Sequence, residues 1–485
     1  MTAVDAQVQG CYIDGKWVVP KQDRLIEVKN PADGSSLAYV PRGDKEEINL
    51  AVKAAKKAFH SREWKTLSPY QRGKLLFQVA ELIRNNKEEL AQLETVDVGK
   101  PLNQSAVDVE IAARYFEYYA GIADKIFGET IPVEPGIIDY TVREPIGIVG
   151  HIIPWNYPLQ IAARSIAVSI ATGNAAILKP AEDTPLTTLK LVELMEPLGL
   201  PKGIVNVVTG YGHEAGAALS GHPEINHITF TGSVETGKRV MASAAQNIVP
   251  VTLELGGKSP NIVFADCNQE QALEWVRKSI IQNAGQTCSA GSRLVIERSI
   301  KDQFVRELAA AMEKLSIGPG IDNHDLGPVL SKKQFDIIQS FMDLAKKDGI
   351  RIVTGGERKQ IEGYEAGYYL QPTILDDVPA THTLAQEEIF GPVLTVTTFQ
   401  TEEEAIEIAN GTPYGLVAGV WTENVGLAHR VASQLQCGQV FINHYGAGGG
   451  MAQPFGGYKK SGFGREKGLE ALRNYTQLKN VALKY

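Results

Sequence analysis

The middle of the chain alternates between short apolar runs and helical stretches, which constrains the fold more than any other feature of the sequence. The expected strands span residues 146–153, 175–178, 205–208, 227–230 and 251–255, and the expected helices span 159–171, 186–198, 214–220 and 235–245. Buried parallel strands form continuous apolar runs and need helical crossovers of this length. The pattern therefore predicts a doubly wound α/β sheet, with ligands outside the carboxyl ends of its strands.

The regions on either side suggest further units. Residues 261–441 look like a second α/β domain, with expected helices at 301–315 and 402–409 and an expected strand at 393–396. Near the N-terminus, Asp44 with Glu47 forms a capping box, and Ser68-Pro69 begins another helix. Two extended stretches, 131–142 and 475–484, belong to neither domain. We expect them to form a β-flap that pairs elsewhere, including across a subunit interface.

Length and charge exclude several classes of protein. At about 150 residues per domain, the 485 residues predict two or three domains. The net charge of −8 argues against nucleic acid as the main ligand. We see no secretory signal and no uncharged apolar run of about 18 residues, so a cytoplasmic protein without a membrane partner is expected. The four cysteines are far apart without a C-x-x-C motif, which indicates neither disulfides nor a metal site.

Two strand ends carry residues suited to a nucleotide. Phe230–Lys238 runs from a strand through Gly232 and Ser233 into a helix, whose N-terminus suits a phosphate. The segment lacks the Ser or Thr of an NTPase loop because Arg239 stands there, so a dinucleotide pyrophosphate fits better. Lys179 and Glu182 follow another strand, and a carboxylate there favours NAD over NADP. A tight turn and an ordinary surface pair are the structural alternatives.

Three further residues could carry chemistry. Cys288 lies among small and polar residues, which suits an accessible nucleophile. Glu254 ends an apolar strand, where partial desolvation suits a general base. Asn156, between two prolines at a strand end, could donate hydrogen bonds to an oxyanion. Taken singly, each also fits a structural role, but the signals together are expected where the architecture places ligands.

Seven ordered motifs give the chain a family resemblance over essentially its whole length. They are Pro154–Pro158, Lys179–Glu182, Phe230–Ser233, Leu253–Gly257, Gly285–Cys288, Glu387–Pro392, and Pro454–Lys459 with Ser461–Glu466. The chain resembles the aldehyde dehydrogenase superfamily. The resemblance implies two Rossmann-related parallel-sheet domains and a small β-flap oligomerisation domain. In that division, residues 1–125 and 146–257 bind NAD, 126–145 and 475–485 form the flap, and 258–474 form the catalytic domain.

The resemblance also implies roles for individual residues. Cys288 would attack the aldehyde, Asn156 would hold the oxyanion, and Glu254 would activate water to hydrolyse the thioester. NAD, with NADP as the less favoured alternative, would be bound by Ile153, Trp155, Lys179, Glu182, Gly232, Ser233, Leu255, Glu388 and Phe390. A homodimer or homotetramer would form through the flap.

The substrate tunnel is expected to include Tyr157, Arg164, Thr287, Ser289 and Phe455. Arg164 stands where several relatives have Trp, and the glycine-rich stretch 444–451 replaces an aromatic, so a wide tunnel for a bulky apolar aldehyde is predicted. A betaine or amino aldehyde, with Tyr157 and Glu117 near it, is one alternative. A semialdehyde bound by Arg164 is another, and Arg164 could instead pair on the surface.

Three rival functions share parts of this machinery. A cysteine esterase or acyltransferase would use the same nucleophile and oxyanion donors without a hydride acceptor. A CoA-acylating dehydrogenase would resolve the thioester with a thiol, against which Glu254 argues. A non-enzymatic scaffold has no need of Asn156, Glu254 and Cys288 together.

Overall fold

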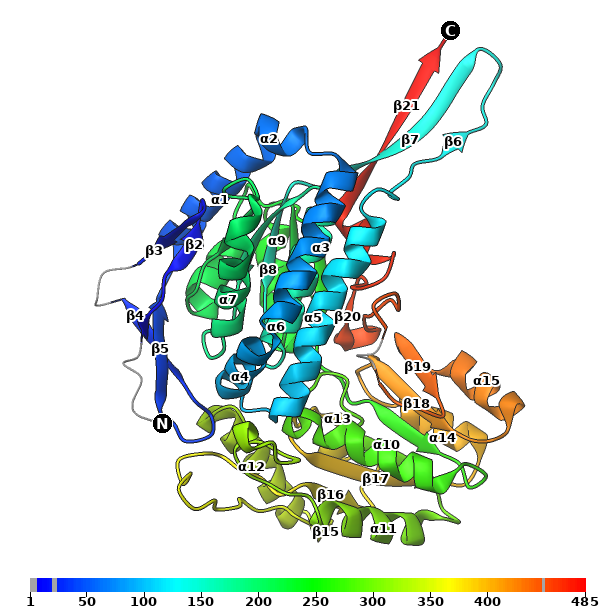
Figure 1. Ribbon diagram of the computed structural model, residues 1–485. Coiled ribbons are helices and arrows are strands. Elements are labelled where there is room, and N and C mark those ends of the chain that lie inside the picture. The colour runs from blue at the N-terminus through cyan, green and yellow to red at the C-terminus, as the bar shows by residue number, and fades with distance from the viewer. Residues whose placement is uncertain (1–6, 20–23, 447–449) are drawn as a thin grey trace.

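A computed structural model describes residues 7–19, 24–446 and 450–485. Two large sheets, each covered by helices, build the body of the molecule (Figure 1). The first has eight strands in the order β20 (Gly462–Phe463), β12 (Val251–Glu254), β11 (His227–Thr231), β8 (Ile148–Ile152), β9 (Ala175–Lys179), β10 (Val205–Val207), β2 (Cys11–Ile13) and β3 (Lys16–Val18). The doubly wound α/β fold predicted from the apolar runs is confirmed.

The strand order of this sheet locates a ligand crevice. Strands β8 to β12 are mutually parallel. The chain moves outward from β8 through β9 to β10, then returns to the other side of β8 for β11 and β12. Ligands of open α/β sheets bind at the carboxyl ends of the strands where the order reverses, which here is between β8 and β11.

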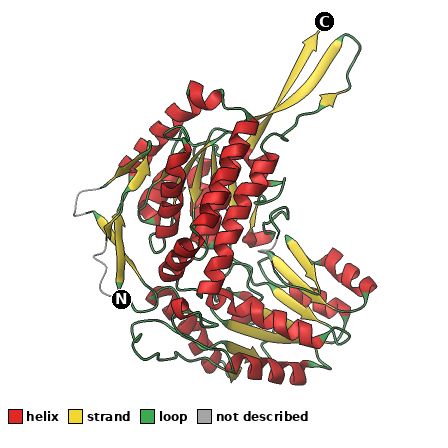
Figure 2. Cartoon of the chain, in the orientation of Figure 1, coloured by secondary structure: helices red, strands yellow, loops and turns green. Residues whose placement is uncertain are grey.

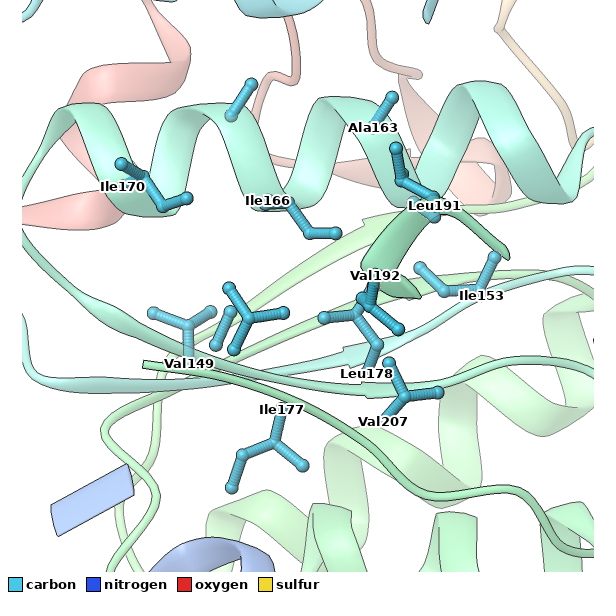
Figure 3. Close-up of a cluster of buried hydrophobic side chains, with 14 of the residues drawn as sticks. Val149, Ile153, Ala163, Ile166, Ile170, Ile177, Leu178, Leu191, Val192 and Val207 are labelled. Carbon is cyan, nitrogen blue, oxygen red and sulfur yellow. The ribbon is translucent and has the colours of Figure 1, made fainter. Parts of the chain in front are cut away.

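Helices α6 (Pro158–Ala171) and α7 (Leu186–Met195) cover one face of this sheet. Figure 3 shows Ile166 and Ile170 of α6 directed toward the strand residues, among them Val149 and Leu178. All four side chains are at most 1% exposed. Burying each contributes roughly 1.5–3 kcal/mol, so this layer holds the β8 end in a fixed place.

The N-terminal part of the chain adds long helices to the same domain. They are α1 (Lys45–His60), α2 (Arg62–Lys65), α3 (Pro69–Asn85), α4 (Lys87–Val98) and α5 (Leu102–Ile122). The capping box of Asp44 and Glu47 starts α1 as predicted, and Ser68 caps α3 with Pro69 in its first turn. Helix α5 packs against both α3 and α6, and so lies close to the ligand edge of the sheet.

The second sheet has seven strands, with helices on both faces (Figure 2). The order is β15 (Arg351–Thr354), β16 (Thr373–Asp376), β17 (Val393–Phe399), β14 (Arg293–Glu297), β13 (Pro260–Val263), β18 (Val417–Trp421) and β19 (Gln439–Ile442). All pairs except β15–β16 are parallel. The main helices of this second domain are α10 (Gln269–Ile281), α11 (Lys301–Glu313), α12 (Lys332–Lys347), α14 (Glu402–Asn410) and α15 (Val425–Gln434). Helix α9 (Val234–Ala245) belongs to the first domain, where it follows β11.

The two unassigned extended stretches pair with each other. Strand β21 (Thr476–Lys484) runs antiparallel to β7 (Ile137–Pro145) over nine residue pairs, and β6 (Thr130–Ile131) adds a third strand. This flap projects away from the body and carries the C-terminus near its tip (Figure 1). A smaller sheet of β1 (Gln7–Val8), β5 (Ser36–Pro41) and β4 (Leu25–Lys29) lies near the N-terminus.

One expected boundary differs from the structure. The range 258–474 was expected to form one domain, but Gly462–Phe463 pair with Leu253 and Glu254 at the edge of the first sheet. The chain therefore returns to the first sheet before residue 474. Among the described residues, no helix combines the length and apolar character that a membrane crossing needs.

Candidate active site

A cavity of about 640 Å³ opens between the two large sheets, and both Cys288 and Glu254 line it. Its walls come mainly from α5, α6, α10 and the segments around residues 288 and 455. All five predicted tunnel residues line it as well: Tyr157, Arg164, Thr287, Ser289 and Phe455. The folded chain thus brings together a thiol, a carboxyl group and an open cavity large enough for an organic substrate.

Cys288 lies on a strained turn that precedes β14. Asn283 and Ala284 have φ values of 48° and 52° in the short helical turn just before it, a backbone region that non-glycine residues rarely adopt. Cys288 therefore stands at the amino end of β14, which corrects the expectation that every signal lies at the carboxyl end of a strand. Such strain is found at functional sites, where the surrounding structure enforces it.

Two tyrosines that line the cavity hold the residues on either side of Cys288. The hydroxyl of Tyr157 lies 2.9 Å from Oγ1 of Thr287. The hydroxyl of Tyr445 donates a hydrogen bond of 2.9 Å to the carbonyl of Ser289. Because both tyrosines are themselves packed in the cavity wall, these bonds fix the direction in which the thiol points.

The glycine pair after Glu254 allows three segments to meet. A Cβ atom on Gly257 would lie 2.6 Å from the carbonyl oxygen of Cys288, and one on Gly256 would lie 2.1 Å from the Glu388 carboxylate. Real Cβ atoms do not approach so closely. At Gly257 the obstacle is backbone, so only glycine fits there, whereas at Gly256 it is the end of the Glu388 side chain, which would have to move. The Glu254 strand end, the Cys288 turn and the Glu388 segment are therefore in direct contact.

The environment sets the protonation of the two reactive groups. Burial raises the pKa of Glu254 to about 8, against the opposing charges of Arg164, Arg465 and Lys467. Burial, together with the nearby Glu254 and Glu388 carboxylates, raises the pKa of the Cys288 thiol to about 12. At neutral pH the thiol is therefore protonated and needs a base, and a carboxyl whose pKa lies near neutrality suits that task.

Asn156 lies next to the cysteine turn. Its Nδ2 donates a hydrogen bond of 2.9 Å to the carbonyl of Gln286, two residues before Cys288, and its own carbonyl accepts one of 3.1 Å from Asn283. The amide has two N–H groups, so the bond to Gln286 leaves a second donor for an oxyanion. Asn156 is 5% exposed and stands behind the cavity wall.

A buried charge cluster that sequence reasoning missed supports this position. Lys100, between α4 and α5, is completely buried and donates to Asn156 O at 2.9 Å, Asp108 Oδ2 at 2.6 Å and Glu94 Oε1 at 3.2 Å. Its Nζ also lies 4.0 Å from the centre of the Tyr157 ring. Burial raises the pKa of both Glu94 and Asp108, and Lys100 opposes that rise. In the sequence Lys100 is simply one lysine of a helix–helix connection.

The β8–β11 crevice contains predicted cofactor residues. Lys179 is 2% exposed and pairs with Glu182 at 2.9 Å. Burial raises the pKa of Glu182, but Lys179 and backbone N–H groups outweigh burial and hold it below its usual value. After strand β11, Ser233 caps α9, and the Gly232 N–H donates a hydrogen bond to the carbonyl of Glu254. The Glu235 side chain turns aside to pair with Lys238, so no carboxylate fills the helix N-terminus.

The remaining predicted cofactor residues lie on segments that meet this edge. Glu388 is partly buried, and desolvation raises its pKa to about 7; it accepts a hydrogen bond of 2.9 Å from Gly257 N. Phe390 adopts a φ of 56° and contacts Trp155 edge to face at 5.3 Å. Ile153 and Leu255 are buried, and their N–H groups bond to the carbonyls of Lys179 and Ser461 respectively.

Two expectations about the tunnel need correction. Arg164 does form a pair, but not on the surface: it is 8% exposed and forms an ion pair with Glu466 inside the protein. Glu117 pairs with Arg84 and does not line the cavity, so it lies apart from the substrate space. Gly446 lines the cavity, while residues 447–449 of the glycine-rich stretch lie outside the described part of the chain.

Comparisons with known proteins agree with this site. A sequence model described as the aldehyde dehydrogenase family matches residues 17–481. The chain is 42% identical to the betaine aldehyde dehydrogenase of Bacillus subtilis (strain 168), over 98% of this chain and 97% of that protein. It is 44% identical to the (Z)-2-((N-methylformamido)methylene)-5-hydroxybutyrolactone dehydrogenase of Acinetobacter baylyi, over 98% of this chain and 96% of that one.

A solved structure shares the whole fold. The NAD⁺ complex of the aldehyde dehydrogenase from Bacillus cereus superposes with a TM-score of 0.96 at 42% identity, covering 98% of this chain and 96% of that chain. Similarity of this extent in both sequence and structure shows the family. The protein belongs to the aldehyde dehydrogenase family and oxidises aldehydes.

Proposed function

We propose that the protein oxidises an aldehyde to the carboxylic acid with NAD as the hydride acceptor, through a covalent adduct on Cys288. The observation that carries the proposal is that Cys288 and Glu254 line one cavity beside the β8–β11 crevice. A thiol for attack and a desolvated carboxylate for proton transfer are the two groups that such a reaction requires of the protein.

The chain's own residues account for the steps at Cys288. Glu254 accepts the thiol proton, and the thiolate sulfur adds to the aldehyde carbonyl to give a thiohemiacetal. The second N–H of the Asn156 amide stabilises the oxyanion of this adduct. NAD, when bound, supplies the acceptor for the hydride whose loss turns the adduct into a thioester. Glu254 first passes the proton that it took from the thiol to solvent, and then takes a proton from water as the water oxygen attacks the thioester carbonyl. The C–S bond breaks to release the acid, and the departing Cys288 sulfur recovers a proton from Glu254.

The crevice residues fit a nucleotide of this kind. The Lys179–Glu182 pair offers hydrogen-bond partners to the hydroxyls of the adenine ribose. The α9 N-terminus with Gly232 and Ser233 suits the pyrophosphate. Glu388, with one oxygen bonded to Gly257, keeps acceptor capacity for the nicotinamide ribose. An ionised Glu182 would repel a 2′-phosphate, so NAD is favoured over NADP. Trp155, Phe390, Ile153 and Leu255 supply the apolar surface around these contacts.

The cavity supports a bulky, largely apolar aldehyde, aromatic or of medium to long chain. Its volume of about 640 Å³ exceeds the needs of an acetaldehyde-sized substrate, and Tyr157, Tyr445 and Phe455 line it near Cys288. A semialdehyde bound by Arg164 is less favoured, because Glu466 already occupies that guanidinium. A betaine or amino aldehyde remains the second candidate because one relative carries that activity in its name.

The flap supports assembly into a homodimer or homotetramer. Leu478 and Leu483 on β21 are 58% and 56% exposed, and Ile138 and Tyr140 on β7 are also exposed. An extended three-stranded sheet that projects from the body with apolar side chains in water is typical of a surface that another subunit covers.

One assay tests the proposed chemistry. Purified protein is mixed with NAD or NADP and with acetaldehyde, decanal, benzaldehyde or betaine aldehyde, and reduced nicotinamide is followed by absorbance. We expect an NAD-linked signal that is largest for decanal or benzaldehyde and absent from Cys288→Ala. Ester cleavage that depends on Cys288, without any NAD reduction, would instead assign the protein to the cysteine esterases.

A further inference from the structure

Arg164 reaches from α6 into the wall of the cavity and forms an ion pair with Glu466. The side chains of the two residues are only 9% and 4% exposed. Glu466 is joined to Phe455 by two backbone hydrogen bonds of 2.7 Å each. The ion pair therefore ties α6 to the segment that carries Phe455 and Gly456.

This segment lies directly against the Glu254 carboxyl. A Cβ atom on Gly456 would lie 2.8 Å from Oε1 of Glu254. Both Glu254 oxygens are buried and accept no hydrogen bond from any described residue. The position of the carboxyl thus depends on the segment packed against it and on the charges around it.

The charges around Glu254 are mostly positive. The titratable groups that face Arg164 or Glu254 from neighbouring elements are Tyr115, Tyr119, His151, Tyr475, Cys288, Arg465, Glu466 and Lys467. Burial raises the pKa of the three tyrosines and of the Cys288 thiol and lowers that of His151 to about 3, so these five groups are neutral near pH 7. Among the cations that lower the pKa of Glu254, Arg164 has the largest effect.

We propose that Arg164 is a positioning residue for Glu254: its ion pair with Glu466 fixes the 455–456 segment against the carboxyl and places a permanent positive charge beside it. The charge opposes the rise that burial causes in the pKa of Glu254, and the segment keeps the carboxyl aligned for proton transfer. This role rests on the proposed function, in which Glu254 is the base.

The test compares three substitutions at this position with a matched control. Arg164→Met and Arg164→Gln remove the charge, the second keeping a hydrogen-bond donor for Glu466, while Arg164→Lys retains the charge. The control, Arg84→Met, breaks a partly exposed pairing with Glu110 and Glu117, and none of these three residues lines the cavity. For each protein, kcat/KM for NAD reduction is measured from pH 5.5 to pH 9.5. The lower limb of this profile is the range over which kcat/KM rises with pH, and the Glu254→Gln variant shows whether that limb reports the ionisation of Glu254.

We expect the lower limb to move up by about one pH unit in both uncharged variants, which lowers kcat/KM at pH 7 about tenfold. Arg164→Lys should keep the limb near that of the wild type, and Arg84→Met should not move it. A uniform loss of rate with the limb unmoved in the uncharged variants would overturn the proposal. So would a limb in Arg164→Lys displaced as far as in Arg164→Met.

Alkylation of Cys288 by iodoacetamide gives a second reading that needs no turnover. Its rate should rise with pH along a limb that Glu254→Gln removes and that Arg164→Gln displaces upward by a similar amount. If the wild type reduced no NAD while this displacement was seen, the proposed function would fail and the link between Arg164 and Glu254 would stand. Unchanged alkylation profiles in all Arg164 variants would overturn the link itself.

Discussion

Removing Lys100 should destabilise the protein more than any loss of a surface ion pair. In Lys100→Met the Glu94 and Asp108 carboxylates, 0% and 3% exposed, lose their shared cation. Deleting one partner of a buried ion pair costs about 3–5 kcal/mol, because the remaining charge stays uncompensated. The matched control is Lys332→Met, which breaks an exposed pair with Asp336 and should change the stability little.

The cost should depend on pH in a defined direction. Without Lys100 the folded-state pKa values of Glu94 and Asp108 rise further above their unfolded values, since burial then acts without opposition. Stability from such groups is present below the unfolded pKa and lost as pH rises through the folded pKa. The deficit of Lys100→Met should therefore be largest at pH 7.5 and shrink toward pH 5.

Thermal unfolding at both pH values, followed by circular dichroism, provides the measurement. Adding Glu94→Gln and Asp108→Asn to Lys100→Met should recover most of the lost Tm, because the uncompensated charges are then gone. A Lys100→Met protein as stable as Lys332→Met at pH 7.5 would refute the reasoning, as would a triple variant no more stable than the single one.

Three further outcomes are expected from the structure. Gly257→Ala places a Cβ atom 2.6 Å from the Cys288 carbonyl oxygen, so the cysteine turn must shift. We expect kcat to fall at least tenfold and Tm to fall as well, and wild-type kcat would contradict the contact. Burial lowers the pKa of His151 to about 3 and that of His227 to about 4. Because each histidine takes up a proton only on unfolding, the free energy of unfolding should fall by about 2 kcal/mol for each between pH 6.5 and pH 5. A free energy from urea unfolding that does not change over that range would contradict their burial as neutral groups. Leu478→Asp on the exposed face of the flap should reduce the oligomer size measured by light scattering, and an unchanged mass would remove the flap from the interface.

The fold was largely predictable because its signals are local. Continuous apolar runs give buried parallel strands, and the five predicted strands of the first sheet match β8 to β12 closely. Asp44 with Glu47 and Ser68 with Pro69 start helices where capping chemistry requires. The β20 strand was missed, since the dipeptide Gly462–Phe463 is too short to show a periodicity and forms a strand only by pairing with β12.

The site was predictable in its residues more than in its arrangement. Cys288, Glu254 and Asn156 stand out in the sequence, but the meeting of Gly257 with the cysteine turn depends on contacts between distant segments. The same holds for Lys100, whose partners lie up to 56 residues away, and for the Arg164–Glu466 pair, which spans most of the chain. No local pattern encodes such pairings.

The central claim is that Cys288 forms an acyl intermediate which Glu254 helps to hydrolyse. The most direct measurement mixes the Glu254→Gln protein with NAD and decanal, quenches in acid, and determines the mass of the intact protein and of the peptide that contains Cys288. Because Glu254 is also the base for the thiol, the adduct should form slowly in this variant, but hydrolysis should be slower still. We therefore predict that, on long incubation, one decanoyl group per subunit accumulates at Cys288 together with one equivalent of reduced NAD. Reduced NAD formed without any acyl mass on Cys288, or an acyl group on another residue, would contradict the account.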